Sequence, residues 1–272
     1  LNENADLGAI IEANRICNEA GFDTITAAST IACLAEIRGV RYTGRELVDK
    51  VREIASLTGD GPLLQLGSAE LARRLGRPGL SMSVKSLEMP AYDPRGAYGM
   101  ALAYGTSTRG ACHLRAYHIS HEILRKPVAT DRFSFSGKAR IIKISEDLNA
   151  VIDSLGACKF AFFGASLEEY AKGFSSVTGI EADTQDLLSS GNTISRLERH
   201  INSLRGFRRE HDLLPERFFT EPGSSGAGIE IPPIDRKAFE GALDRYYRIR
   251  GCSPDGTFPQ DKAREIQACM GR

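Results

Sequence analysis

Apolar side chains recur along most of this chain at intervals of three and four residues, the spacing that places them on one face of an α-helix. Many of these runs close at a glycine, which can adopt the left-handed backbone conformation after a last helical turn. The runs cover residues 7–21, 24–39, 43–59, 68–76, 97–124, 138–155, 184–205, 235–250 and 257–272, with one more behind Ser166. Strand-like alternation is scarce, so the pattern predicts an all-α, multihelical fold.

Two of the predicted helices begin with a capping box, in which a hydroxyl and a glutamate three residues later bond each other's backbone donors. Thr43 with Glu46 forms one box, and Ser166 with Glu169 forms the other. Both pairs support the helix starts that the apolar spacing indicates.

The stretch SLEMPAYDPRGAYG, residues 86–99, interrupts the helical pattern with two prolines and two glycines. We place a domain junction there and predict two helical domains, residues 1–86 and 87–272. A second interruption, EPGSSGAGIEIPP at residues 221–233, is typical of a surface connector.

Charge and composition exclude several classes of protein. Apolar residues make up 42% of the chain, and 35 basic residues balance 35 acidic ones, so no electrostatic signal favours nucleic acid or a membrane as a partner. The start, LNENADLGAI, lacks the basic and apolar regions of a signal peptide, and no apolar run approaches the roughly 18 residues of a spanning helix. We therefore expect a cytoplasmic protein.

The six cysteines lie far apart and form no CxxC pair, which argues against a disulfide framework or a self-contained zinc site. Cys17 and Cys33 fall on apolar helix positions, and we interpret Cys252 as a packing residue. The chain also begins without methionine and enters a helical pattern within a few residues, so we interpret it as a piece of a longer protein.

A faint internal repeat joins two of the predicted helix ends. NRICNEAGFDTIT, residues 14–26, aligns without gaps with NAVIDSLGACKFA, residues 149–161. The alignment pairs Asn18 with Asp153, Gly21 with Gly156, and Asp23 with Cys158. A side-chain acceptor beside the open carbonyls of a helix end suits a flat heterocycle with several N–H donors, although two ordinary helix ends would also give this pattern.

Together with the linking stretch SLEMPAYDPRGAYGMALAYGTSTRGACHLRAY, these paired segments resemble the tungsten-dependent aldehyde ferredoxin oxidoreductase family. The resemblance continues through LERHINSLRGFRREHDLLPERFFTEP and LDRYYRIRGCSPDGTFP and covers nearly all of the chain. It implies the two carboxyl-terminal helical domains of that family, sharing a cofactor-facing cleft. A missing amino-terminal domain would carry a CxxCxxxC segment and much of the cofactor surface.

The resemblance also implies roles for the paired residues. Asp153 would hold one pterin of a tungsten or molybdenum bis-pterin, and Asn18 with Asp23 would hold the other. Asn18 departs from the family's aspartate, and its amide oxygen accepts hydrogen bonds without carrying a charge. Cys158 would be the fourth thiolate ligand of a 4Fe-4S cluster.

RGACHLR, residues 109–115, contains the residue that the resemblance places near the metal, His113. An imidazole titrates near neutrality and could carry a proton while the metal takes electrons. A structural histidine is the alternative. A Cys112–His113 thiol dyad is disfavoured because adjacent helical residues diverge by about 100 degrees.

Four further polar residues have weaker signals. In YDPRG, residues 92–96, Asp93 is expected to cap the next helix, while Arg95 either faces the cofactor cleft or supports the turn. His118 and His121 lack an acidic partner for a metal site, so we expect surface residues.

The leading hypothesis is the carboxyl-terminal portion of an oxidoreductase that oxidises a small aldehyde to an acid, reduces ferredoxin, and is inactive without its amino-terminal domain. One alternative is a tungsten subunit acting on another substrate, such as an aromatic thioester. Another is a helical interaction module without catalysis. A CxxCxxxC segment upstream would distinguish the enzyme from the module.

Overall fold

The computed structural model describes residues 2–224, 226 and 228–270, and it is all-α apart from one two-stranded antiparallel hairpin among these residues. The all-α prediction is confirmed. The chain divides into two compact units. Unit 1 comprises residues 1–96, 109–112 and 213–233, and unit 2 comprises residues 97–108, 113–212 and 234–272.

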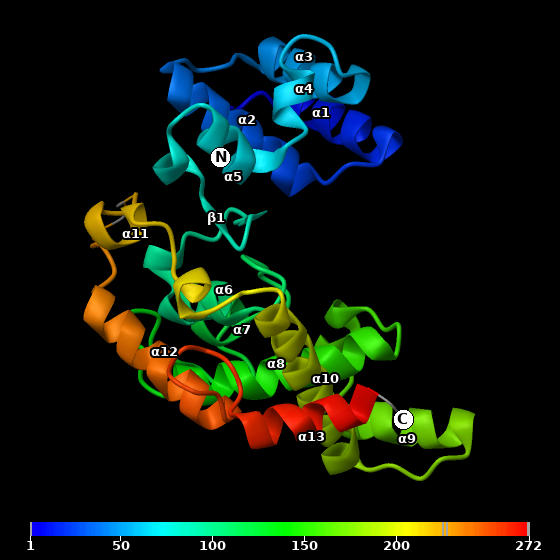
Figure 1. The fold of residues 1–272 in the computed structure, drawn as a ribbon. Coiled ribbons are helices and arrows are strands. Elements are labelled where there is room, and N and C mark those ends of the chain that lie inside the picture. The colour runs from blue at the N-terminus through cyan, green and yellow to red at the C-terminus, as the bar shows by residue number, and fades with distance from the viewer. Residues whose placement is uncertain (1, 225, 227, 271–272) are drawn as a thin grey trace. The chain divides into compact units, whose positions relative to one another are not determined.

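Unit 1 is a small helical bundle with the hairpin beside it (Figure 1). Its helices are α1 (Leu7–Ala20), α2 (Thr24–Arg38), α3 (Gly44–Ser56), α4 (Gly61–Leu64), α5 (Gly67–Arg74) and α11 (Arg217–Thr220), with 3₁₀ turns η1 (Pro78–Leu80) and η2 (Pro94–Gly96). Strands β1 (Ser83–Val84) and β2 (Leu87–Glu88) pair in register Ser83 to Glu88. The bundle closes over a core that includes fully buried Ile31, Leu34 and Leu71.

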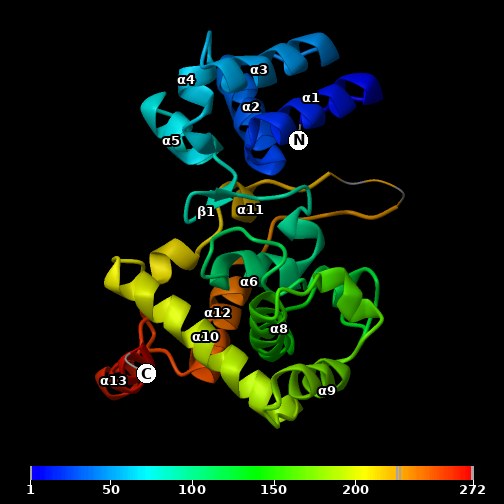
Figure 2. The same ribbon diagram turned by 90° about the vertical axis from the view of Figure 1, so that its right-hand side faces the viewer.

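Unit 2 is built around α8, which packs against α6, α10 and α12; Figure 2 shows α8 beside α10. Its helices are α6 (Tyr98–Thr106), α7 (Ile119–Glu122), α8 (Lys138–Ser154), α9 (Leu167–Thr178), α10 (Thr184–Leu204), α12 (Arg236–Arg250) and α13 (Gln260–Met270), with 3₁₀ turns η3 (Lys159–Phe163) and η4 (Arg209–Asp212). Gly191 permits the α8–α10 contact, because a Cβ there would lie 2.0 Å from the carbonyl oxygen of Asp147.

Most predicted helix limits agree with the structure to within a few residues, and both capping boxes form. The predicted helical run over 97–124 is wrong, because the helix α6 ends at Thr106 and residues 107–118 are irregular before α7. The third helix also ends earlier than predicted, at Ser56, where Leu57 rather than Gly59 takes the left-handed C-cap position with φ 54°.

The predicted division into residues 1–86 and 87–272 stays a prediction about domains. The compact units divide the chain differently, since unit 1 extends to residue 96 and includes two later segments. The predicted connector at 221–233 follows α11 within the last of these segments, and the described residues of the connector itself form only an isolated bridge between Gly226 and Ile229.

Candidate functional site

The two aligned helix ends have nearly the same backbone geometry. Gly21 after α1 and Gly156 after α8 are left-handed, with φ of 80° and 65°. Asp23 and Cys158 follow in extended conformation, at φ −67° and ψ 128° and at φ −71° and ψ 127°. Each of these two residues is also the N-cap of the next helix. We call residues 18–23 the first tip and residues 153–158 the second tip.

A further backbone contact is shared by the tips. The amide of Phe22 donates to the carbonyl of Cys17, and the amide of Ala157 donates to the carbonyl of Ile152, both at 3.1 Å. This bond spans five residues and belongs to the Schellman type of helix end, which requires the left-handed residue between its partners. The sequence repeat therefore corresponds to a repeated backbone shape.

The side chains of the first tip, in unit 1, make only local hydrogen bonds. The Asn18 amide is exposed and donates to the carbonyl of Asn14 at 2.8 Å. A carboxylate oxygen of Asp23 accepts from the amide of Thr26 at 2.7 Å, so this residue caps α2. One carboxylate can accept several hydrogen bonds, so capping leaves Asp23 able to contact a ligand as well.

The second tip, in unit 2, has a different electrostatic environment. Asp153 lies 2.8 Å from the Nζ of Lys159 and 3.7 Å from the guanidinium of Arg115, and 41% of its side chain remains exposed. Cys158 is exposed and is not part of a disulfide. The second tip thus presents a carboxylate that is balanced by two cations, next to an accessible thiol.

Arg115 joins the second tip to the RGACHLR segment. Besides Asp153, its guanidinium contacts the Glu198 carboxylate of α10 at 3.0 Å. Sequence reasoning did not single out Arg115, Lys159 or Glu198 as site residues. All three stand inside stretches that carry the resemblance, but no local pattern marks any of them as a site residue.

His113 is half-buried in the irregular segment, and its carbonyl accepts from the amide of Tyr117 at 3.1 Å. Its catalytic role stays a prediction. The helical argument against a thiol dyad with Cys112 had a wrong premise, because neither residue is helical. Cys112 is nevertheless only 6% exposed, so its thiol is poorly placed to meet a substrate.

The prediction that His118 and His121 are surface residues is wrong. His118 is fully buried, His121 is nearly so, and their rings stack with centroids 5.0 Å apart. Neither ring nitrogen of His118 has a hydrogen-bond partner among the described residues. Burial, with Lys138 and His121 nearby, lowers the pKa of His118 to about 3, so the ring is neutral near pH 7.

Arg95 is committed to contacts within unit 1. Its guanidinium pairs with Asp93 at 2.7 Å, donates to the carbonyls of Glu221 and Pro222, and lies 5.2 Å from the ring centroid of Phe218. Asp93 in turn accepts from the Arg95 amide and so caps η2 rather than α6. The structural interpretation of Arg95 thereby gains support, and a cofactor contact stays a prediction.

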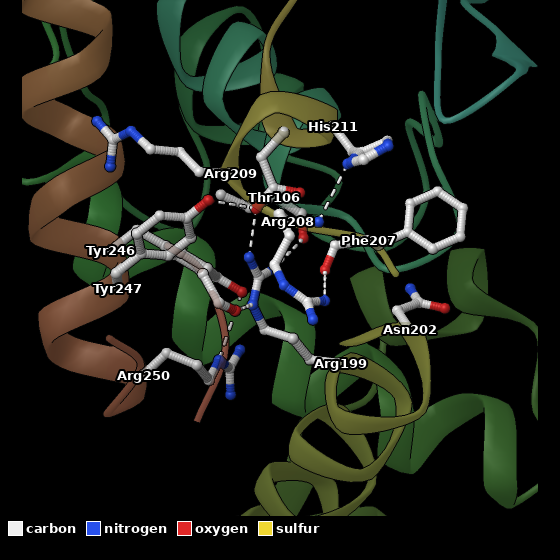
Figure 3. A network of polar contacts seen from close by, with 12 residues as sticks. Thr106, Arg199, Asn202, Phe207, Arg208, Arg209, His211, Tyr246, Tyr247 and Arg250 are labelled. Carbon is white, nitrogen blue, oxygen red and sulfur yellow. Dashed lines mark hydrogen bonds and ion pairs between the residues drawn. The ribbon is translucent and has the colours of Figure 1, made fainter. Parts of the chain in front are cut away.

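A buried polar network in unit 2 fixes the end of α6, from which the RGACHLR segment departs (Figure 3). Arg199 of α10 pairs with Asp212, and it donates to the carbonyl of Thr106 at 3.3 Å. Tyr247 of α12 donates to the same Asp212 carboxylate at 2.6 Å. Buried charges that are fully paired hold their neighbours in one arrangement, and loss of one partner would leave an uncompensated charge.

The donor set of this chain fits a shared cofactor site and not a complete one. Among residues 2–224, 226 and 228–270, no three His, Cys, Asp or Glu side chains are grouped to hold a metal ion. The exposed thiol of Cys158 alone could not hold a four-iron cluster, which takes four thiolates, so its predicted role as one cluster ligand stays a prediction. The exposed acceptors at both tips suit a ligand rich in N–H donors.

Comparison with known proteins gives a family match over nearly the whole chain. The family model described as aldehyde ferredoxin oxidoreductase, domains 2 and 3, matches residues 1–267. A tungsten-containing aldehyde ferredoxin oxidoreductase of Pyrococcus furiosus is 38% identical over an alignment of 278 residues, which covers 96% of this chain and 45% of that protein. The protein of the same description from Thermococcus kodakarensis is also 38% identical, with the same coverage. The chain spans less than half the length of these relatives.

Among solved structures, this chain is similar to the active site complex BamBC of benzoyl coenzyme A reductase, determined with 1,5-dienoyl-CoA. The TM-score is 0.74 at 16% identity, over 96% of this chain and 46% of that one. At this identity the likeness concerns the fold alone. Over the part of the chain that the structure describes, no helix has both the length and the apolar character needed to cross a membrane.

Proposed function

Because this chain belongs to the aldehyde ferredoxin oxidoreductase family, we propose that it is the carboxyl-terminal portion of a tungsten-pterin, iron–sulfur enzyme that oxidises aldehydes to carboxylic acids. Ferredoxin would accept the electrons. The observation that carries this proposal is the repeated backbone geometry of the tips, with side-chain acceptors at Asn18 and Asp23 in the first tip and at Asp153 in the second.

The residues of the two tips would bind the cofactor in different ways. Asn18 and Asp23 would accept hydrogen bonds from one pterin, and Asp153 would accept from the other. Cys158 would supply one thiolate to a 4Fe-4S cluster, completing a set whose other ligands lie outside this chain. When bound, the tungsten-pterin would take up two electrons and the cluster would pass them on singly.

His113 would handle the protons of the reaction. Conversion of an aldehyde and water into a carboxylic acid releases two electrons and two protons. A neutral imidazole can accept one of these protons through a ring nitrogen and release it to solvent, and an aldehyde within about 3 Å of that nitrogen would be suitably placed. The half-buried position of His113 would limit competing water while keeping a path for the proton.

The proposal is tested with the full-length reading frame and its purified product. We expect a CxxCxxxC segment upstream, tungsten at one atom per chain, and aldehyde-dependent reduction of ferredoxin. The 272-residue chain expressed alone should contain neither tungsten nor a complete cluster, because it holds only one cluster thiolate and part of the pterin contacts. Stoichiometric tungsten in that shorter chain would contradict the proposal. Absence of both the cysteine segment and tungsten from the full product would favour an interaction module.

The substrate class needs a separate assay. The similarity to a benzoyl coenzyme A reductase complex concerns the fold and gives no reason to prefer a thioester here. Full-length enzyme should reduce ferredoxin with small aldehydes and not oxidise a dienoyl thioester. Turnover of the thioester alone would support the alternative of a tungsten subunit with another substrate.

A further inference from the structure

One carboxylate holds both ends of the segment that carries His113. Glu198 accepts from the hydroxyl of Thr108 at 2.6 Å and from the guanidinium of Arg115 at 3.0 Å. Thr108 and Arg115 lie on either side of residues 109–114, which form no helix or strand. A segment without its own backbone ladder depends on such side-chain contacts for its conformation.

The helix α10 adds a second contact on the same face. Asn202 lies four residues after Glu198, so the two side chains project one turn apart. The Asn202 amide donates to the carbonyl of Thr108 at 2.6 Å. The start of the segment is therefore held through both a side-chain hydroxyl and a backbone carbonyl, and its end is held through Arg115.

The helix that provides these contacts is itself fixed. Arg199, the residue after Glu198, is buried and donates to the carbonyls of Thr106 and Gly256, and Figure 3 shows it beside Tyr246 and Tyr247 of α12. Glu198 thus projects from a part of α10 whose position the buried network determines. Its own side chain is 32% exposed, and the hydrogen bonds from Thr108 and Arg115 orient the carboxylate.

The contacts of Glu198 also reach the second tip. Arg115 contacts Asp153 at 3.7 Å and Glu198 at 3.0 Å, so its guanidinium lies between the two carboxylates. A guanidinium can serve two carboxylates at once because its five N–H donors point in fixed directions. Without Glu198, Arg115 would lose its shorter contact and would be free to turn toward Asp153 alone.

We infer that Glu198 is a positioning residue: it fixes the segment that carries His113 and sets the direction of Arg115 at Asp153. The inference rests on the proposed function for its catalytic consequence, but the structural part stands without it. Glu198 makes no contact with the reacting atoms in this scheme. It acts through Thr108 and Arg115.

The structural part is tested by amide hydrogen exchange on the 272-residue chain. In Glu198→Ala we expect exchange of amides 108–118 to rise on the order of 10-fold, because both ends of the segment lose a charged hydrogen-bond acceptor. Glu198→Gln keeps one acceptor oxygen, so its effect should be intermediate. Glu265→Gln is the matched control, because it changes another carboxylate of unit 2, one that lies 3.8 Å from the guanidinium of Arg196. It should leave the exchange rates of amides 108–118 unchanged.

Equal exchange at 108–118 in wild type and Glu198→Ala would overturn the inference. So would a uniform rise over all of unit 2, which would assign Glu198 a general stabilising role. A rise confined to the segment would support it.

The catalytic part is tested in full-length enzyme loaded with tungsten and iron. We expect Glu198→Ala to lower kcat about 10-fold or more with little change in KM, and to shift the pH profile of kcat, because the imidazole is no longer held in place. Glu198→Gln should restore part of kcat at unchanged metal content. Suppose that amides 108–118 exchange faster in Glu198→Ala while kcat and its pH profile stay unchanged. This result would overturn the catalytic role of the segment, including that of His113, and would leave the positioning contact intact.

Discussion

The two tips share a backbone and differ in what surrounds it. The first tip carries an uncharged amide at Asn18, and the second carries the carboxylate of Asp153 between two cations. At the last aligned position the first tip has an oxygen acid that caps α2, and the second has an exposed thiol. A helix end closed by a left-handed glycine thus provides a common acceptor geometry, and the side chains at two positions decide its charge and, under the proposed function, would decide its metal chemistry.

The largest difference between the tips should appear at the aligned pair Cys158 and Asp23. In full-length protein, Cys158→Ser leaves three thiolates for a cluster that takes four, so we expect loss of the complete cluster and of ferredoxin reduction. Asp23→Ser, the matched change at the first tip, keeps a capping oxygen and should leave the iron content unchanged. Iron and sulfide analysis with electron paramagnetic resonance measures both. A full iron complement in Cys158→Ser would refute the assignment.

The charge difference is tested by exchanging the amide and the carboxylate. Asp153→Asn removes the charge that balances Arg115 and Lys159, and we expect about 10-fold weaker tungsten retention. Asn18→Asp restores the family's residue at an exposed position and should change retention by less than about 3-fold. Metal analysis after dialysis gives the result. A larger effect at Asn18 than at Asp153 would reverse the proposed ranking of the two tips.

Acid should affect the two units unequally, because all five histidines lie between residues 113 and 211, within unit 2. Burial lowers the pKa of His118 below its unfolded value, to about 3, and also lowers that of His121. Protons therefore bind the unfolded state more tightly than the folded state. The stability that the fold gains from keeping the His118 ring neutral is complete above about pH 6.5 and is lost as the pH falls toward 3. At pH 5 we expect His118 alone to reduce the free energy of unfolding by about 2 kcal/mol.

The measurement is denaturant unfolding between pH 7 and pH 5, followed by amide exchange that reports each unit separately. His118→Phe keeps a flat ring and should lose much of the acid effect on unit 2, while amides of unit 1 respond little in either protein. The control His211→Phe concerns an exposed histidine whose ring nitrogen accepts from the amide of Arg208. Equal acid sensitivity in wild type and His118→Phe would contradict the explanation.

The sequence predicted the tips well because their signals are local. A glycine after an amphipathic run needs no information from distant segments, and Gly21 and Gly156 both take the expected left-handed conformation at a helix end. The N-cap role of Asp23 and the 3₁₀ turn after Cys158 were not predicted. The end of α6 at Thr106 was missed for a related reason. Every residue from Gly99 to Thr106 is buried, so the helix is apolar on all sides and its spacing does not mark where it ends.

The contacts around the second tip could not be predicted because they join residues far apart in the chain. Arg115 meets Glu198 over 83 positions, and Thr108 meets it over 90. The burial of His118 is equally non-local: the ring lies against Gly99, where a Cβ would come within 1.8 Å of its Cδ2 atom. Histidine spacing carries no information about such a contact, and the expectation of two surface residues therefore failed.

The smallest expected effect tests the shared backbone itself. A Cβ added at Gly21 or at Gly156 would meet no atom within 4 Å, so a substitution at either position reports the strain of a left-handed backbone without any clash. We expect Gly21→Ala and Gly156→Ala to lower the free energy of unfolding by about 1 kcal/mol each, and the two asparagine variants by less, because asparagine tolerates this conformation better. Denaturant unfolding with amide exchange near each helix end distinguishes the units. If alanine were neutral at one tip and destabilising at the other, the two helix ends would differ in solution, and the repeat would no longer support two equivalent pterin sites.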